Sequence, residues 1–427
     1  MKLHFEDEYI RKHYLDGMTG LELESHRVDQ QGHLSDRPHP FEDNPYVDRD
    51  FSEDQIEINT PPTDSPEEAL EFLSEQLTQI HQELRQHREL LWPFSNPPII
   101  RNEEDIPIAV YTGDQAPSYY YRIYLAERYG KYKMTYSGIH FNYSFSETLL
   151  RRNFEIEKGN AKTFRAYQDQ FYLKLAEKVL AYSWVVVALL AASPLVDNSF
   201  YEAGKSGRSL FTGFSSLRCS EYGYWNPFLP ILSYDSVSGY ADSIEQYLDQ
   251  GLLIQARELY YPVRIKPPGK YTLQALREKG ISHIELRMID LNPFAHSGVE
   301  INDLEFLRLL LIWLAAQDFP PLDQQEQMQA LQNHKTAAGF DWDIGRITMP
   351  GQRTGTLRQY LETLLHDMTG FFSDLGDASA AGVLSLQEEK LRSASARYTD
   401  RVRKLFGDDY IGAGIQRAME LQEAHHV

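Results

Sequence analysis

Residues 282–289 read Ser-His-Ile-Glu-Leu-Arg-Met-Ile, with an apolar side chain at every second position. This period of two indicates a β-strand whose two faces differ, because successive side chains point to opposite sides of a sheet. The polar positions that share one face are His283, Glu285 and Arg287. The stretch therefore predicts a strand with one buried face and one face that carries ionisable groups.

Three other stretches alternate in the same way, at residues 21–28, 54–60 and 135–145. Residues 257–266 are a weaker candidate, because Pro262 interrupts them and proline cannot donate to a strand ladder. The polar positions that share a face within each strand are Glu22 and Glu24, then Gln55, Glu57 and Asn59, then His140, Asn142 and Ser144. Several strands of one sheet are therefore expected to present a polar face.

Long helical stretches separate these strands. The clearest runs from Thr63 to Trp92, where Ser65 can cap the helix, Pro66 suits its first position and apolar residues recur every three or four positions. Further helices are expected near residues 165–192, 240–256, 302–317, 355–375 and 384–406. This interleaving predicts an α+β fold, with a curved, mostly antiparallel sheet backed by helices.

The composition excludes several classes of protein. The 427 residues carry 62 Asp+Glu against 42 Lys+Arg, a formal net charge of −20, and this argues against a nucleic-acid partner, which clustered Lys and Arg would bind. The single cysteine cannot form an internal disulfide, which fits a reducing, cytoplasmic location. The longest apolar run, Trp184 to Leu195, is shorter than the roughly 20 residues of a membrane helix, and the acidic N-terminus does not resemble a signal peptide.

The polar strand faces are the most informative feature. A single Glu-x-Glu usually faces water, but four strands that each carry such a polar face favour one shared functional site. Carboxylates and imidazoles are ligands that suit Mg²⁺ or Mn²⁺, and converging carboxylates repel one another unless cations neutralise them. We therefore expect a concave sheet surface that holds two or more divalent ions for phosphoryl transfer from a nucleotide or for metal-assisted hydrolysis. The sequence contains no dinucleotide-binding fingerprint. Gly204-Lys205-Ser206 resembles the end of a P-loop, but Ser199 occupies the position of the first glycine, so a P-loop is not predicted.

Seven colinear stretches resemble the glutamate–cysteine ligase family, in particular its bacterial enzymes and the ligase half of bifunctional glutathione synthetases. They include Gly20-Leu-Glu-Leu-Glu-Ser-His-Arg-Val28 and Ile284-Glu-Leu-Arg-Met-Ile-Asp-Leu-Asn-Pro-Phe294. The other five are residues 50–61, 91–97, 128–130, 137–145 and 259–264. The resemblance implies a funnel-shaped antiparallel sheet similar to that of glutamine synthetase, with ATP entering from one end and amino acids from the other.

The resemblance also implies a set of metal ligands and a reaction. The implied ligands are Glu22, Glu24, Asp50, Glu57, His140 and Glu285. All but Asp50 also lie on the polar strand faces. The implied reaction transfers the ATP γ-phosphate to the side-chain carboxylate of L-glutamate, and the amine of L-cysteine then attacks the acyl phosphate, as the first step of glutathione biosynthesis. Mg²⁺ or Mn²⁺ is the expected cofactor and ATP the co-substrate.

Two arginines are the candidate catalytic residues. Arg287 suits a bidentate contact with a carboxylate or phosphate, with an ion pair to a neighbouring Glu as the alternative. Arg218 matches a family arginine that faces the acceptor or the transferring phosphate. The candidate substrate-binding residues are Arg122, Arg264, Tyr121, Leu125, Phe51 and Tyr224. For the last four, ordinary core packing is the alternative.

Residues 1–376 are expected to form the catalytic domain and residues 377–427 a C-terminal helical appendage. Because no second ATP-grasp domain follows, glutathione itself is not expected as the product. Met134 and Tyr136 depart from the family near the acceptor pocket, so a γ-glutamyl ligase with another acceptor amine stays open. A non-catalytic sensor of nucleotide or glutamate is the candidate from a different class. The oligomeric state is left open, a monomer included.

Overall fold

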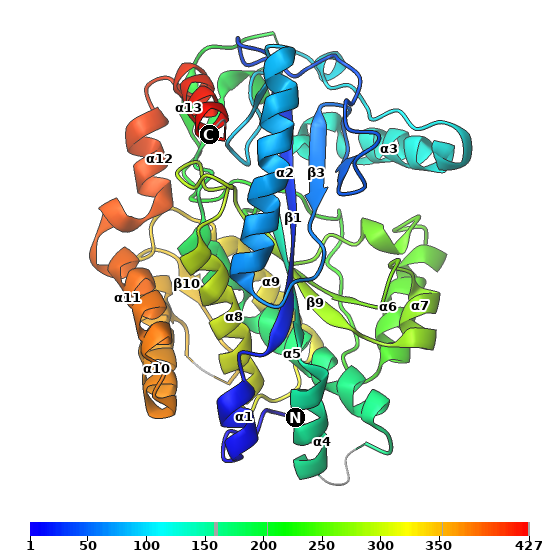
Figure 1. The fold of residues 1–427 in the computed structure, drawn as a ribbon, viewed down its shortest axis with the longest axis vertical. Helices are drawn as coiled ribbons and strands as arrows, with labels where there is room; N and C mark the ends of the chain where they lie inside the picture. The colour runs from blue at the N-terminus through cyan, green and yellow to red at the C-terminus, as the bar shows by residue number, and fades with distance from the viewer. Residues whose placement is uncertain (158–160, 203, 352, 426–427) are drawn as a thin grey trace.

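A seven-stranded sheet lies at the centre of the computed structural model, which describes residues 1–157, 161–202, 204–351 and 353–425 (Figure 1). The strand order is β2-β3-β1-β5-β9-β8, with β4 paired to β1 beside this path, and every pairing is antiparallel. The strands are β1 (Gly17–Val28), β2 (Val47–Arg49), β3 (Gln55–Asn59), β4 (Leu90–Leu91), β5 (Ile139–Phe145), β8 (Val263–Lys266) and β9 (His283–Ile289). The predicted α+β class and the four strands with a period of two are confirmed.

The strand register brings the polar positions of different strands together. Glu22 of β1 lies opposite His140 of β5, and Glu24 lies opposite Glu57 of β3. Glu285 of β9 lies between β5 and β8. A slip of one residue in any of these pairings would turn that strand's carboxylates to the other face, so the register itself builds the polar surface.

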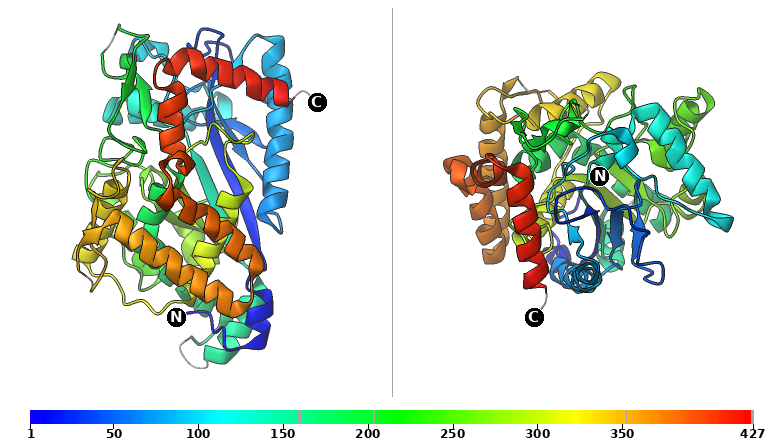
Figure 2. Two further views of the ribbon diagram at one scale, coloured as in Figure 1. Left: turned by 90° about the vertical axis from the view of Figure 1, so that its left-hand side faces the viewer. Right: turned by 90° about the horizontal axis from the view of Figure 1, so that it is seen from above.

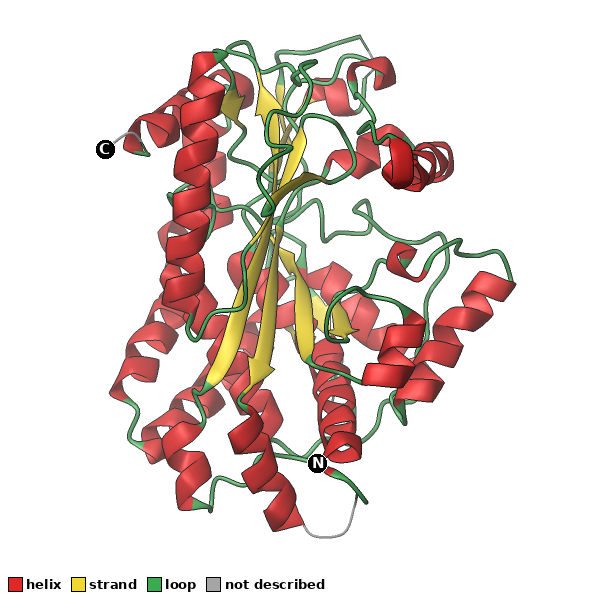
Figure 3. Ribbon diagram, turned by 45° about the vertical axis from the view of Figure 1, so that its right-hand side comes forward, coloured by secondary structure: helices red, strands yellow, loops and turns green. Residues whose placement is uncertain are grey.

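Helices cover the apolar face of the sheet (Figure 3). The long helices α2 (Pro66–Gln86), α5 (Phe164–Leu190) and α8 (Ile301–Ala316) bury their side chains in one core with the apolar residues of β1, β3, β5 and β9. The other helices are α1 (Glu8–His13), α3 (Ala116–Tyr129), α4 (Glu147–Glu157), α6 (Val237–Asp249), α7 (Leu273–Lys279), α9 (Gln324–Ala337), α10 (Leu357–Leu375), α11 (Ala378–Arg392), α12 (Tyr398–Phe406) and α13 (Tyr410–Ala424). Two small sheets pair β6 (Leu195–Asp197) with β7 (Ser209–Phe211) and β10 (Arg346–Ile347) with β11 (Gly355–Thr356).

The helix expected from Thr63 to Trp92 is shorter than predicted. It begins as expected, because Oγ of Ser65 accepts a hydrogen bond from the amide of Glu68 at 3.1 Å. It ends at Gln86, and Arg88 then adopts a left-handed backbone conformation with φ 58°. The chain turns there because Leu90 and Leu91 pair with the end of β1 and bury their side chains. Apolar residues can be buried in a helix or in a strand, so the sequence alone does not distinguish the two.

The single helix expected over residues 384–406 is two helices. Helix α11 ends at Arg392, where Ser393 is extended with φ −138°, and α12 begins at Tyr398. The hydroxyls of Ser393 and Ser395 lie 2.7 Å apart between them. Serines favour such local hydrogen bonds over helix, and this explains the break.

The helices after residue 376 share buried clusters with the rest of the chain. Figure 2 shows α13 beside α2. Side chains of α12 and α13 pack with Val28, Trp92 and Phe94, and a methyl group added at Gly414 would lie 2.5 Å from the Trp92 ring. The domain boundary at 376 stays a prediction. Among the described helices, none has the length and apolarity that crossing a membrane requires.

Candidate active site

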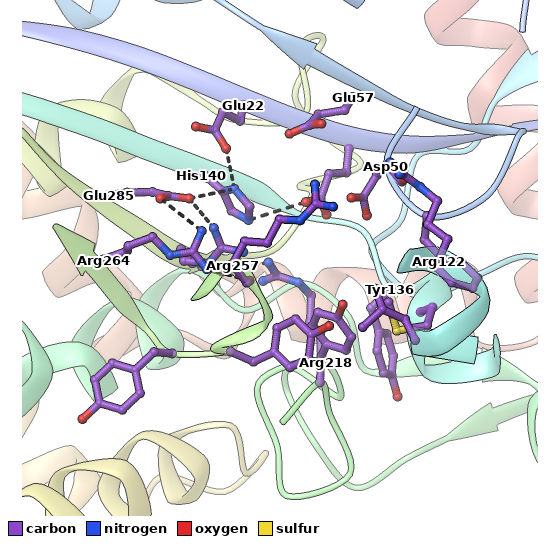
Figure 4. Close-up of a pocket in the computed structure, with 18 of the residues that line it drawn as sticks. Glu22, Asp50, Glu57, Arg122, Tyr136, His140, Arg218, Arg257, Arg264 and Glu285 are labelled. Carbon is purple, nitrogen blue, oxygen red and sulfur yellow. Dashed lines mark hydrogen bonds and ion pairs between the residues drawn. The ribbon is translucent and has the colours of Figure 1, made fainter. Parts of the chain in front are cut away.

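The polar face of the sheet forms one wall of a cavity of about 550 Å³ (Figure 4). Helix α3, the segment 218–225 and the segment 257–262 contribute the other walls. Every side chain proposed from the sequence as a metal ligand, catalytic residue or substrate contact lines this cavity. They are Glu22, Glu24, Asp50, Phe51, Glu57, Tyr121, Arg122, Leu125, His140, Arg218, Tyr224, Arg264, Glu285 and Arg287. Their position together supports the proposed roles without assigning them.

Three of the proposed metal ligands form a close cluster at one end of the cavity. Nδ1 of His140 lies 2.8 Å from Oε2 of Glu22 and 3.3 Å from Oε1 of Glu285. On the opposite side of the ring, Nε2 lies 3.5 Å from Oε1 of Glu24. Ligand atoms of Glu22, His140 and Glu285 all lie within 4.8 Å of one another. This arrangement follows from the register, because these residues come from three adjacent strands.

Glu57 and Asp50 line the same cavity (Figure 4), and Glu24, which lies opposite Glu57 in the sheet, completes a second group of carboxylates. Burial, and next the charge of Asp50, raise the pKa of Glu24 to about 8 and hold the pKa of Glu57 well above its usual range. Glu24 and Glu57 therefore resist ionisation unless a cation approaches. Such a group attracts positive charge, as a binding site for divalent ions does.

Glu22 and Glu285 behave in the opposite way. Burial opposes their ionisation, but basic groups outweigh it. The hydrogen bond to His140 and the charge of Lys266 lower the pKa of Glu22 to about 2. The charges of Arg287 and Lys266 hold the pKa of Glu285 well below its usual range. Two carboxylates of the site are thus ionised in the folded protein, whereas two others on the same face are held protonated.

The residues of the cluster fit a divalent ion. Two carboxylates and an imidazole are a suitable donor set for Mg²⁺ or Mn²⁺. Burial, and next the charge of Arg287, lower the pKa of His140, so its ring stays neutral, which is the form that coordinates metals. Oδ1 of Asn142 is buried without a hydrogen-bond partner in the described part of the chain, and Oε2 of Glu285, also without a hydrogen bond, forms an ion pair with Nζ of Lys266 at 3.2 Å.

Three arginines surround this cluster, and each is oriented by the protein. The guanidinium of Arg287 donates a hydrogen bond to Glu285, so the predicted alternative, an ion pair with a neighbouring Glu, is present, and the substrate contact stays a prediction. Arg218 donates to the backbone carbonyl of Arg287 at 2.8 Å. Arg264 donates to the carbonyl of Leu259 at 3.1 Å and lies 3.8 Å from Oε2 of Glu285. Their charges are therefore fixed around the carboxylates.

Arg122 was proposed as a substrate contact, but the structure places its guanidinium against the backbone. It donates to the carbonyls of Asp50 and Ser118 and to the carbonyl of Arg49, the last at 2.9 Å. The hydroxyl of Tyr111 accepts a further bond at 3.3 Å. Each of its three nitrogens is engaged. Arg122 therefore fixes the loop that carries Asp50, and this is a positioning role that the sequence did not reveal.

The proposed acceptor wall is also part of a small apolar cluster. Phe51, Tyr121, Leu125 and Met134 pack together and face the cavity, while the rings of Tyr224 and Tyr260 lie 3.8 Å apart between centroids. These side chains thus pack in an apolar cluster and also line the cavity. Cys219 is buried nearby, and burial followed by the charge of Asp290 raises its thiol pKa to about 11, so it stays a thiol.

Four lysines and arginines that line the cavity were not predicted from the sequence: Arg49, Arg257, Lys266 and Lys270. Lys266 reaches Glu22 and Glu285, and Arg257 stacks on Tyr121 with its guanidinium carbon 4.1 Å from the ring centroid. The signal for Lys266 was its spacing of two from Arg264, which places both on one face of the weak strand candidate. For Arg257 no comparable signal exists, because it lies in a short turn.

Comparison with known proteins points to one family. A family model described as glutamate–cysteine ligase matches residues 4–251 and 230–337. The chain is 40% identical over 321 residues to a glutathione biosynthesis bifunctional protein of Listeria monocytogenes, covering 72% of this chain and 41% of that protein. It is 32% identical over 387 residues to a glutamate–cysteine ligase of Clostridium acetobutylicum, covering 78% and 79%. A crystal structure of a bifunctional glutathione synthetase from Pasteurella multocida superposes with a TM-score of 0.85 at 27% identity, over 100% of this chain and 55% of that one. The chain thus spans less than half of the bifunctional Listeria relative.

Proposed function

This chain belongs to the glutamate–cysteine ligase family, and we propose that it joins the γ-carboxylate of L-glutamate to the amine of L-cysteine at the expense of ATP. The observation that carries the proposal is the division of the cavity into two kinds of charge. Carboxylates and His140 line the strand wall, and the guanidinium groups of Arg218, Arg264 and Arg287 lie beside them. A cavity that must hold a triphosphate, a glutamate carboxylate and divalent ions at once needs both kinds.

The chemistry explains why both charges are required. A carboxylate is a poor electrophile, because oxide is a bad leaving group. In the proposed reaction an oxygen of the glutamate side chain attacks the γ-phosphorus and ADP leaves. The amine then attacks the acyl carbon, phosphate leaves, and the amine nitrogen loses a proton. The first step brings two anions together, so fixed positive charge in the cavity lowers its barrier.

Different residues of the cavity would bind the metal ions and orient the substrates. Glu22, His140 and Glu285 would hold a divalent ion, with Glu24, Asp50 and Glu57 available to a further one. When bound, such an ion would screen the charge between the triphosphate and the glutamate carboxylate. Arg218 and Arg287 would orient the carboxylate or the transferring phosphate, and the hydrogen bonds that hold both at the edge of the carboxylate cluster support this role.

The decisive experiment measures phosphate release from ATP with glutamate and a panel of amines, cysteine among them. Cysteine should give the highest turnover, and γ-glutamylcysteine should form in equal amount to the phosphate released. Glu57→Ala and His140→Ala should abolish Mg²⁺-dependent release. Wild-type turnover in both variants would refute the metal assignment.

A second candidate is the same ligase chemistry with another acceptor amine. It is favoured by Tyr136, which is 5% exposed and whose hydroxyl has no hydrogen-bond partner among the described residues. Tyr136 lines the cavity beside Met134, and its ring also packs against Phe200. The same panel separates the two candidates, because a better amine than cysteine would identify the second. A sensor without catalysis would be stabilised by Mg²⁺ and ATP yet release no phosphate with any amine. The cytoplasmic location stays a prediction from the single cysteine.

A further inference from the structure

Lys266 lies at the end of β8 with its ammonium group against the proposed metal cluster. Nζ is 3.2 Å from Oε2 of Glu285 and 3.5 Å from Oε1 of Glu22. Its side chain is only 18% exposed. It therefore bridges, from one side, the same two carboxylates that His140 bridges from the other.

Glu285 meets more positive charge than one carboxylate can neutralise. Arg287 approaches its Oε1, whereas Lys266 and Arg264 approach its Oε2. A divalent ion that used Glu285 and Glu22 as ligands would share these oxygens with the ammonium group. Two cations at ion-pair distance from one oxygen repel each other strongly in a partly buried site. One of the basic groups must then withdraw.

Lys266 is the group best able to withdraw. Arg264 is tied to the backbone carbonyls of Arg257 and Leu259, and Arg287 is bonded to Glu285 itself. The ammonium of Lys266, by contrast, makes no hydrogen bond to a backbone carbonyl within the described ranges. Its four-carbon stem is flexible, so it can move its charge across the cavity without a change in β8.

We propose that Lys266 is an exchangeable counter-ion, which neutralises Glu22 and Glu285 until a divalent ion displaces it and which then binds a phosphate of the nucleotide. This inference rests on the proposed function, because it assumes that the cluster takes a metal. An ammonium group is a compact phosphate ligand. Metal binding would thus free a cation for the nucleotide, and the two ligands would bind cooperatively.

The test is the affinity for Mn²⁺ alone, measured by titration calorimetry without nucleotide. Lys266→Met removes the competing charge and should tighten Mn²⁺ binding about tenfold. A role confined to packing would weaken it or leave it unchanged. The same variant should bind ADP in saturating Mg²⁺ about tenfold more weakly, because the phosphate contact is lost. Lys266→Arg keeps the charge and should bind Mn²⁺ as the wild type does.

Lys270→Met is the matched control. Lys270 lines the same cavity, so this variant reports the effect of removing a positive charge that does not touch the cluster. Its Mn²⁺ affinity should change less than that of Lys266→Met. Equal tightening in both variants, or no tightening in Lys266→Met, would overturn the proposal.

The proposed function is tested in parallel by the thermal stabilisation of the wild type with Mg²⁺ and ATP. If that stabilisation is present while Lys266→Met binds Mn²⁺ no more tightly, only the inference about Lys266 fails. If it is absent and no variant binds Mn²⁺, the metal assignment and this inference fail together.

Discussion

Glu22 and Glu24 lie two residues apart on one face of β1, yet their substitution should change stability in opposite directions. Glu24 is held protonated, because burial and the charge of Asp50 raise its pKa to about 8. In the unfolded chain it ionises near pH 4.5, so the folded state loses stability as the pH rises from there towards 8. Glu24→Gln removes this penalty. The expected gain is about 1 kcal/mol at pH 5 and about 4 kcal/mol at pH 8, at about 1.4 kcal/mol per pH unit.

The contribution of Glu22 to folding stability has the opposite sign. Although burial opposes it, the contacts with His140 and Lys266 lower its pKa to about 2. A depressed carboxyl pKa contributes stability above the unfolded value, and this contribution is lost only as the pH falls through the folded value. Glu22→Gln should therefore cost about 3 kcal/mol at both pH 5 and pH 8. The two variants thus differ in sign and in pH dependence.

The assay is urea unfolding of both variants and the wild type at pH 5 and pH 8, with EDTA present to exclude divalent ions. Relaxation of the cavity and entry of water can reduce both magnitudes by a factor of two, but they leave the signs unchanged. Changes of the same sign in the two variants, or a Glu24→Gln gain that is equal at both pH values, would refute the electrostatic account of this site. Both variants should also lose stabilisation by Mg²⁺ and ATP, since each removes a proposed ligand.

Three further predictions concern positions around the site and outside it. Gly138→Ala would place a methyl group 2.5 Å from the guanidinium carbon of Arg218, so phosphate release should fall by about tenfold or more while the melting temperature changes little. Arg122→Ala leaves the carbonyl groups around Asp50 unpaired, and should cost about 2 kcal/mol in urea unfolding and weaken Mn²⁺ binding. Burial and the charge of His425 lower the pKa of His81 to about 3, so the fold excludes a proton that the unfolded chain binds below pH 6.5. Stability should fall with decreasing pH, and His81→Leu should reduce the slope by about 1.4 kcal/mol per pH unit between pH 6 and 4.

Each of these three predictions has an outcome that would contradict it. For Gly138 it is normal turnover in the alanine variant, which would show that Arg218 is not needed in its present position. For Arg122 it is rescue of metal binding by Arg122→Lys, because one ammonium cannot replace a fork that holds three carbonyl groups. For His81 it is an unchanged slope of stability against pH.

Much of the sheet was predictable, because the alternation of side chains is a local property. In β1, β3, β5 and β9 the alternation alone separates the two faces, and it places Glu22 and His140 on the polar one. β8 was less clear, because Pro262 interrupts the pattern. That weak signal concealed Lys266, although its spacing from Arg264 already placed both on one face.

Other features depended on contacts between residues distant in sequence. Leu90 and Leu91 continue a helical pattern, but they pair with β1, because an apolar segment can be buried by either structure and the neighbouring strand decides. Arg122 shows the same limit. A guanidinium next to a pocket suits a carboxylate or a phosphate, and only the position of the Asp50 loop shows that Arg122 donates to backbone carbonyls.

The sequence by itself determined which residue types share a face, and therefore that carboxylates and an imidazole would line one side of a sheet. It also carried the stretches that resemble glutamate–cysteine ligases. Only the tertiary structure decided how these groups are charged. Glu22 and Glu24 are equivalent in the alternating pattern, yet one is held ionised by His140 and Lys266 and the other is held protonated by burial and the charge of Asp50. Electrostatic energies depend on distance and burial, and these are fixed by the register and by the loops that close the cavity.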